Sequence, residues 1–168
     1  MHRGTAPSAW VESLEEYVFD GGGLLALHSA AASFKNNATY GELLGGVFTG
    51  HGPVETFTVE PGGTAATAGT GGTGGTWPFG QRFSVRDELY ELKVTTDVTV
   101  HLQAVRDRGS DKQPQDGKNL PVCWTRHFSR GRVAYLSLGH TAEALAAPEV
   151  ARIIDHLFRW IQDGSRST

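Results

Sequence analysis

Two histidines stand where apolar runs of the chain stop. His28 follows the run LLAL (residues 24–27), and His140 comes at the end of the run that begins VAYLSL at residue 133. If both runs are parallel strands of one sheet, the two imidazoles arrive at the same edge of that sheet. An imidazole titrates near neutral pH, so a pair of them can serve as an acid and a base on one ligand. A single histidine is more often structural, but the pair favours catalysis, with His28 as principal acid or base.

Carboxylates and further polar groups lie in the segments FSVRDELYELKV and TGHGP. Glu88 can fix an imidazole tautomer or itself move a proton, so we add it to the catalytic set; a solvated turn is the equal alternative. Asp87 is predicted to contact substrate. Tyr90 is included among the predicted substrate-binding residues, although a core or rim aromatic is the favoured interpretation. His51, between two glycines, is either a substrate contact on a flexible loop or an exposed loop histidine.

Small residues follow His28 and predict a tight turn from the strand into a helix. Such an elbow presents its side chain at the strand end, next to backbone N–H groups of the first helical turn. The N–H groups of Ser29 and Ala30 are therefore predicted to bind substrate as donors to an anion or oxyanion.

Other chemistries lack the required spacing. Cys123 lies within a strand and is assigned to the core, and the glycine-rich GTGGTGG is not followed by a lysine that would bind phosphate. Neither CxxC nor HExxH occurs. A metal ion held by the site histidines and Glu88 is chemically conceivable, but no spacing requires it. The prediction is therefore made with no metal and no cofactor. Three further histidines are assigned structural roles: His101, His127 and His156.

The periodicity of the chain predicts the elements that position these residues. An amphipathic helix is expected over residues 8–20, a short helix ends at residues 45–46, and the last helix begins near residue 148 with apolar residues at three- and four-residue steps. Strands are expected at residues 24–27, 54–60, 97–105, 121–128 and 132–140, the last two forming a hairpin across the turn at residues 129–131. The unbroken apolar run at residues 24–27 is typical of a parallel sheet.

The composition describes one domain over residues 1–168. The net charge of −3 gives no reason to expect nucleic acid, and no apolar run is long enough for a membrane span or resembles a signal peptide. A single cysteine suits a reducing cytoplasm. Residues 61–76 contain only Pro, Gly, Thr and Ala and are expected to form a mobile loop.

Four motifs together give a family resemblance: GGGLLALHSAAASF, YGELLGGVFTGHGP, RDELYEL and GRVAYLSLGHT. From about residue 8 to residue 162 the chain resembles the ThuA-like (trehalose utilisation) family. This resemblance implies a flavodoxin-like α/β/α sandwich of three layers with a mostly parallel sheet, as in class I glutamine amidotransferases. His28 occupies the elbow where glutaminase relatives carry a nucleophilic cysteine, and His140 falls near their triad histidine. Without that cysteine the chain is not expected to be a glutamine amidotransferase.

The resemblance also implies a substrate class. The family is linked to the catabolism of trehalose and related disaccharides through 3-keto sugars. We therefore expect a cytoplasmic carbohydrate-processing enzyme that acts on a small sugar by acid–base chemistry. A non-catalytic sugar-binding or assembly module is the first alternative, and a metal-dependent hydrolase is the second.

Two features depart from the family pattern. Family members begin with a strand, a helix and another strand before the helix expected at residue 8, so this chain is expected to be N-terminally short. The sheet would then have an exposed apolar edge. Three alternatives are open: the natural protein is longer, a partner chain such as a second copy in a homo-oligomer covers the edge, or this copy of the family is decayed. The family also carries a His-Pro step ahead of DELY, where this chain has TWPFGQRF.

Overall fold

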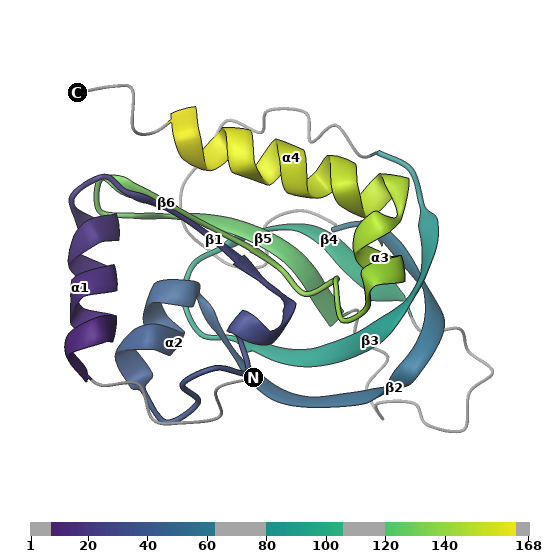
Figure 1. The fold of residues 1–168 in the computed structure, drawn as a ribbon, viewed down its shortest axis with the longest axis horizontal. Coiled ribbons are helices and arrows are strands. Elements are labelled where there is room, and N and C mark those ends of the chain that lie inside the picture. Colours follow the sequence, from purple (N-terminus) through teal and green to yellow (C-terminus); the bar gives the residue numbers. More distant parts are fainter. Residues whose placement is uncertain (1–7, 63–79, 106–119, 164–168) are drawn as a thin grey trace.

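A computed structural model describes residues 8–62, 80–105 and 120–163 of the chain. Six strands form one sheet, and helices flank it (Figure 1). The elements, in chain order, are α1 Ser8–Phe19, β1 Gly23–Leu27, the 3-10 turn η1 His28–Ala30, α2 Ala38–Leu44, β2 Gly46–Pro61, β3 Phe83–Val94, β4 Thr99–Val105, β5 Leu120–Phe128, β6 Gly131–Leu136, α3 Ala142–Ala146 and α4 Pro148–Asp163.

The sheet is mixed and mostly antiparallel, so the predicted mostly parallel sheet is wrong. Its strand order is β1-β6-β5-β4-β2-β3, and only β1 and β6 run parallel among the described strands. The predicted hairpin is confirmed, because β5 and β6 pair antiparallel across the turn from Phe128 to Gly131. Helices cover both faces of β5 and β6, and this gives an antiparallel hairpin the continuous apolar sequence that parallel strands usually have.

Two apolar clusters on opposite faces of the sheet account for its flanking helices. Along β6, Ala134 and Leu136 pack with α3 and α4, whereas Val133 and Tyr135 pack with α1 and α2. The predicted last helix is confirmed as α4, which buries Val150, Ile153, Leu157 and Ile161 at three- and four-residue steps. Burial of each such side chain contributes about 1.5–3 kcal/mol. The helices therefore hold β1 and β6, which carry the two candidate histidines, from both sides (Figure 1).

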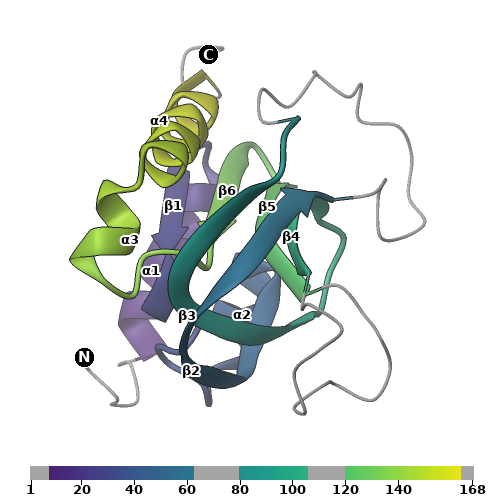
Figure 2. The ribbon, with the colours of Figure 1, turned by 90° about the vertical axis from the view of Figure 1, so that its right-hand side faces the viewer.

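β2 and β3 form a long curved antiparallel ribbon that extends beyond the helix-covered part of the sheet (Figure 2). β2 starts at Gly46, eight residues before the predicted start, and so includes His51, which we predicted in a loop. Pairing with β3 shifts register between Phe48 and Gly50 and again between His51 and Val54. The glycines and the proline of this segment therefore make irregularities within the strand instead of ending it.

Two predictions fall largely outside the described residues. The glycine- and threonine-rich loop predicted at residues 61–76 overlaps the description only at Pro61, the last residue of β2, and Gly62. The polar loop predicted near residues 106–119 is not described. Within the described ranges, each helix falls short of the length and apolarity needed to cross a membrane.

Candidate functional site

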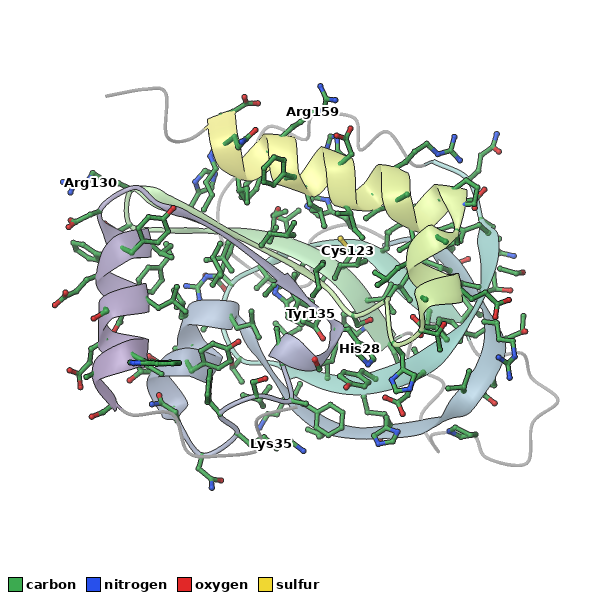
Figure 3. All side chains as sticks on the ribbon, viewed as in Figure 1. His28, Lys35, Cys123, Arg130, Tyr135 and Arg159 are labelled. Carbon is green, nitrogen blue, oxygen red and sulfur yellow. The ribbon has the colours of Figure 1, made fainter. Side chains whose placement is uncertain are left out.

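His28 stands at a sharp turn directly after β1, as the elbow prediction required. It begins η1 with a φ of 38°, a left-handed backbone conformation that is uncommon for a residue with a side chain. The buried hydroxyl of Tyr135 donates a hydrogen bond to the carbonyl oxygen of His28 at 3.0 Å, and Figure 3 shows the two residues next to each other. Such strained conformations persist where neighbouring contacts hold them, and they gather at functional sites.

The two ring nitrogens of His28 have different partners. Nδ1 lies 2.7 Å from the backbone carbonyl oxygen of Ser137. A carbonyl can only accept, so Nδ1 carries the proton, and in the neutral ring Nε2 presents a lone pair. Nε2 lies 3.1 Å from Nδ1 of His140, and the predicted meeting of the two imidazoles is confirmed.

Burial lowers the pKa of His28. Loss of solvent is the largest cause, and nearby His140 lowers the pKa further. The Ser137 carbonyl and the carboxylates of Asp87 and Glu88 act in the opposite direction and raise it. The net shift is downward, so His28 is a neutral imidazole at neutral pH.

Glu88, on β3, brings three histidines around one carboxylate. Its Oε2 lies 3.5 Å from Nε2 of His28 and 3.2 Å from Nδ1 of His140. Its Oε1 lies 2.9 Å from Nδ1 of His51, which is on β2. The Glu88 side chain is only 12% exposed, whereas that of His51 is 47% exposed. The cluster is therefore closed on its inner side by the sheet and is accessible past His51 and the partly exposed His140.

Asp87 holds the backbone that carries His140. One carboxylate oxygen accepts from the N–H of Gly139 at 2.6 Å, and the other accepts from the N–H of His140 at 3.0 Å. The Asp87 side chain is completely buried. Both oxygens are engaged by backbone N–H groups and the residue is buried, so the predicted contact of Asp87 with substrate stays a prediction. Asp87 positions the segment after β6.

Tyr90 forms the buried wall behind His28. It is 2% exposed, and its ring centroid lies 4.2 Å from that of His28. Phe48 also packs against Tyr90, with ring centroids 4.6 Å apart, and the ammonium group of Lys35 lies 4.1 Å from the centroid of Phe48. The placement of Tyr90 supports its reading as a core aromatic that fixes the orientation of the His28 ring.

The other predicted residues divide between the site and the rest of the fold. Ser29 and Ala30 occupy η1 directly after His28, and the role of their N–H groups stays a prediction. Cys123 is completely buried, which raises its thiol pKa, in agreement with its assignment to the core. His101 lies away from the cluster, and its Nε2 shares a hydrogen bond of 2.7 Å with the Thr125 hydroxyl. Burial and, to a lesser extent, the nearby His156 lower the pKa of His101 to about 4.

Two partners of His28 were not anticipated from the sequence. The Ser137 carbonyl and the Tyr135 hydroxyl lie 109 and 107 residues away along the chain. A backbone carbonyl has no side-chain signature, and Tyr135 looks like any aromatic residue in an apolar strand. Only the parallel pairing of β1 with β6 brings both to the elbow.

The profile of the ThuA family, described as trehalose utilisation, matches residues 3–161. The chain belongs to the ThuA family. The resemblance seen in the four sequence motifs is thereby confirmed, and all the residues of the His–Glu cluster in this ThuA-family chain lie inside the matched range. No curated protein matches the sequence.

Solved structures similar to this ThuA-family chain share its fold at low identity. A putative ThuA-like protein from Parabacteroides merdae has a TM-score of 0.74 at 14% identity, covering 98% of this chain and 69% of that one. The cytoplasmic protein STM1381 from Salmonella typhimurium has a TM-score of 0.58 at 16% identity, with 94% and 60% covered. A catalytic mutant of Gan42B, a GH42 β-galactosidase from G. stearothermophilus, has a TM-score of 0.53 at 14% identity, covering 88% of this chain and only 19% of the galactosidase.

Proposed function

We propose that this chain is a carbohydrate-processing enzyme that acts on a trehalose-derived or other 3-keto sugar by proton transfer at His28, Glu88 and His140. The observation that carries the proposal is the convergence of these three side chains, from β1, β3 and the segment after β6, to mutual distances of 3.1–3.5 Å. Family membership in trehalose utilisation supports the substrate class.

The reaction type follows from the chemistry of a keto sugar. A proton on the carbon next to a carbonyl can be removed by a positioned base when the developing oxyanion is stabilised. The Nε2 lone pair of His28 is the base, because Ser137 holds the proton on the opposite nitrogen. His140 is the partner acid that delivers a proton to oxygen or carbon, and Glu88 orients its ring.

Substrate is proposed to enter past His51, whose exposed ring belongs to the outer side of the cluster. The N–H groups of Ser29 and Ala30 remain proposed donors to the oxyanion. A small sugar is the only partner that the proposal needs. The proposed compartment is the cytoplasm, and the structurally similar Salmonella protein STM1381 is described as a cytoplasmic protein.

Hydrogen exchange tests the proposal without a known product. The purified chain is incubated in D2O with 3-keto-trehalose, and NMR follows deuterium entering at the carbons on either side of the keto carbon. We expect enzyme-dependent exchange, reduced by roughly 100- to 10,000-fold in His28→Ala, as for loss of a general base. The matched control is His127→Ala, which removes an exposed imidazole outside the cluster.

Exchange that is undiminished in His28→Ala would overturn the assignment of the base. Binding of sugars in calorimetry, with no exchange or turnover across a panel of disaccharides and keto sugars, would instead favour the non-catalytic sugar-binding module.

A further inference from the structure

We infer that His28, Glu88 and His140 bind one divalent transition-metal ion, with zinc as the best-matched probe. The inference rests on the proposed function in placing the chemistry at this cluster. Metal binding itself is measured without turnover, so the two can fail separately. The ligand atoms are Nε2 of His28, Nδ1 of His140 and Oε2 of Glu88, all within 4.8 Å of one another.

The spacing of these atoms matches a tetrahedral coordination sphere. Zinc binds imidazole nitrogen and carboxylate oxygen at about 2.0–2.2 Å, which sets the distance between neighbouring ligand atoms at about 3.3–3.6 Å in a tetrahedron. The three sides of the observed triangle are 3.1, 3.2 and 3.5 Å. An ion slightly above the plane of this triangle reaches all three atoms with small side-chain adjustments. Three protein ligands leave a fourth position for water or a sugar oxygen, as in catalytic zinc sites.

The donors and acceptors of the three ligand atoms also favour a bound cation. Nδ1 of His28 keeps its proton and donates a hydrogen bond to the Ser137 carbonyl oxygen, so Nε2 of the neutral ring is an acceptor, and an ionised Glu88 has only acceptors. One proton on Nδ1 of His140 can lie toward His28 or toward Glu88. In either case Nε2 of His28 and Oε2 of Glu88 face each other as two acceptors at 3.5 Å. A cation bound to all three atoms, with the His140 proton on Nε2, replaces this contact between two acceptors with a bond from each of them to the ion.

The surrounding groups form the outer shell that a metal site requires. Ligating histidines usually donate their second N–H to a carbonyl or carboxylate, as His28 does to Ser137. Oε1 of Glu88 accepts a hydrogen bond from Nδ1 of His51. This nitrogen also lies 2.8 Å from the carbonyl oxygen of Gly52, which can only accept, so Nδ1 of His51 carries the proton. Asp87 fixes the backbone of His140. The side chains of His28 and Glu88 are therefore oriented by hydrogen bonds, and the backbone of His140 is positioned, before an ion arrives.

The ligand atoms also predict which metal ions bind and which groups then act on the substrate. Two imidazoles and one carboxylate suit zinc, cobalt, nickel or manganese, whereas magnesium and calcium prefer oxygen ligands throughout. With an ion in place, the Nε2 lone pair of His28 is bound to the ion and no longer serves as the base, and the ion would polarise the keto oxygen. Nε2 of His51 is then the ring nitrogen left to accept a proton.

Metal titration of the full chain tests the inference. Protein stripped with EDTA is titrated with Zn²⁺ in competition with a chromophoric chelator, and with Co²⁺ while visible absorption is recorded. We expect one ion per chain, a tetrahedral Co²⁺ spectrum, and no detectable binding of Mg²⁺ or Ca²⁺. His140→Ala and the near-isosteric Glu88→Gln should each weaken zinc binding by more than about 100-fold, which exceeds the typical effect of an outer-shell change. The control His127→Ala should bind as the unaltered chain does.

The outcomes separate the two proposals. Binding that is absent, or that survives in both ligand variants while circular dichroism shows them folded, overturns the metal inference. Deuterium exchange that persists after EDTA treatment, in protein that takes up no ion, overturns the metal inference and leaves the proposed function standing. Stoichiometric zinc that both ligand variants lose, with no exchange or turnover of any sugar, supports the metal site and removes the proposed function.

Discussion

Replacing Asp87 with asparagine should destabilise the fold by loosening the segment that carries His140. The buried carboxylate accepts two backbone hydrogen bonds, at 2.6 Å from Gly139 and 3.0 Å from His140. Asparagine keeps one acceptor oxygen but turns an NH2 group toward the other backbone N–H, which is left buried and unpaired. An unsatisfied buried group costs about 1–3 kcal/mol, and the remaining bond loses its charge, so we expect about 2–4 kcal/mol in total.

Thermal and NMR measurements check this prediction. For a chain of this length 1 kcal/mol corresponds to about 2–4 °C in Tm, so Asp87→Asn should melt roughly 4–16 °C lower. The amide proton resonances of Gly139 and His140 should move upfield, because they lose a charged acceptor. The control is Glu55→Gln at the exposed residue paired with Asp87 across β2 and β3. Equal melting of the two variants, with unmoved amide resonances, would refute the reasoning.

Three further substitutions or conditions test the structure around the site. Tyr135→Phe removes the hydroxyl that donates to the buried His28 carbonyl and should cost about 1–2 kcal/mol in urea unfolding. Gly131→Ala places a methyl group against the carbonyl oxygen of Val18, where backbone cannot yield, so it should cost about 3 kcal/mol or prevent folding, as judged by soluble yield and circular dichroism. Acidification should also destabilise the fold through His101, whose pKa is about 4 when folded and 6.5 when unfolded. Below pH 6.5 the unfolded chain binds a proton that the folded chain does not, so stability falls by up to about 3 kcal/mol as the pH drops to 4.

Matched controls accompany these three tests. Tyr17→Phe alters an exposed tyrosine and should change the free energy of unfolding by less than about 0.5 kcal/mol. Gly80→Ala meets no described atom within 4 Å and should fold normally. His101→Gln should flatten the acid dependence of unfolding. Equal free energies of unfolding for Tyr135→Phe and Tyr17→Phe would contradict the first prediction, and normal folding of Gly131→Ala would contradict the second. An acid dependence of unfolding that is unchanged in His101→Gln would contradict the third.

Local pattern was sufficient to predict α1, α2 and α4, the hairpin and the elbow, but not the short helix α3. In α4 the apolar residues recur with the helical period, and the same residues are buried. The turn between Phe128 and Gly131 brings antiparallel strands together over a short range, so its sequence specifies the pairing. His28 was identifiable because an apolar run stops at it and small residues follow.

The directions of the strands, and the different roles of the neighbouring residues Asp87 and Glu88, could not be predicted from local pattern. Nothing in the sequence of β2 states that it pairs antiparallel with both β3 and β4, because pairing is a property of segments far apart in the chain. Asp87 and Glu88 are adjacent acidic residues with similar chemistry. Only the register of β3 directs one carboxylate to the backbone near His140 and the other to its ring.

The parallel pairing of β1 with β6 has a consequence for how the family can diversify. Hydrogen-bonded strands lie about 4.8 Å apart, and the His28 and His140 ring centroids, each carried beyond the end of one of these strands, are 5.1 Å apart. The parallel pairing fixes where both strands end, and the hydrogen bonds from the backbone of Gly139 and His140 to Asp87 fix where His140 lies beyond β6. Descendants that retain both the pairing and Asp87 keep the two ring positions, and selection can change which side chains occupy them.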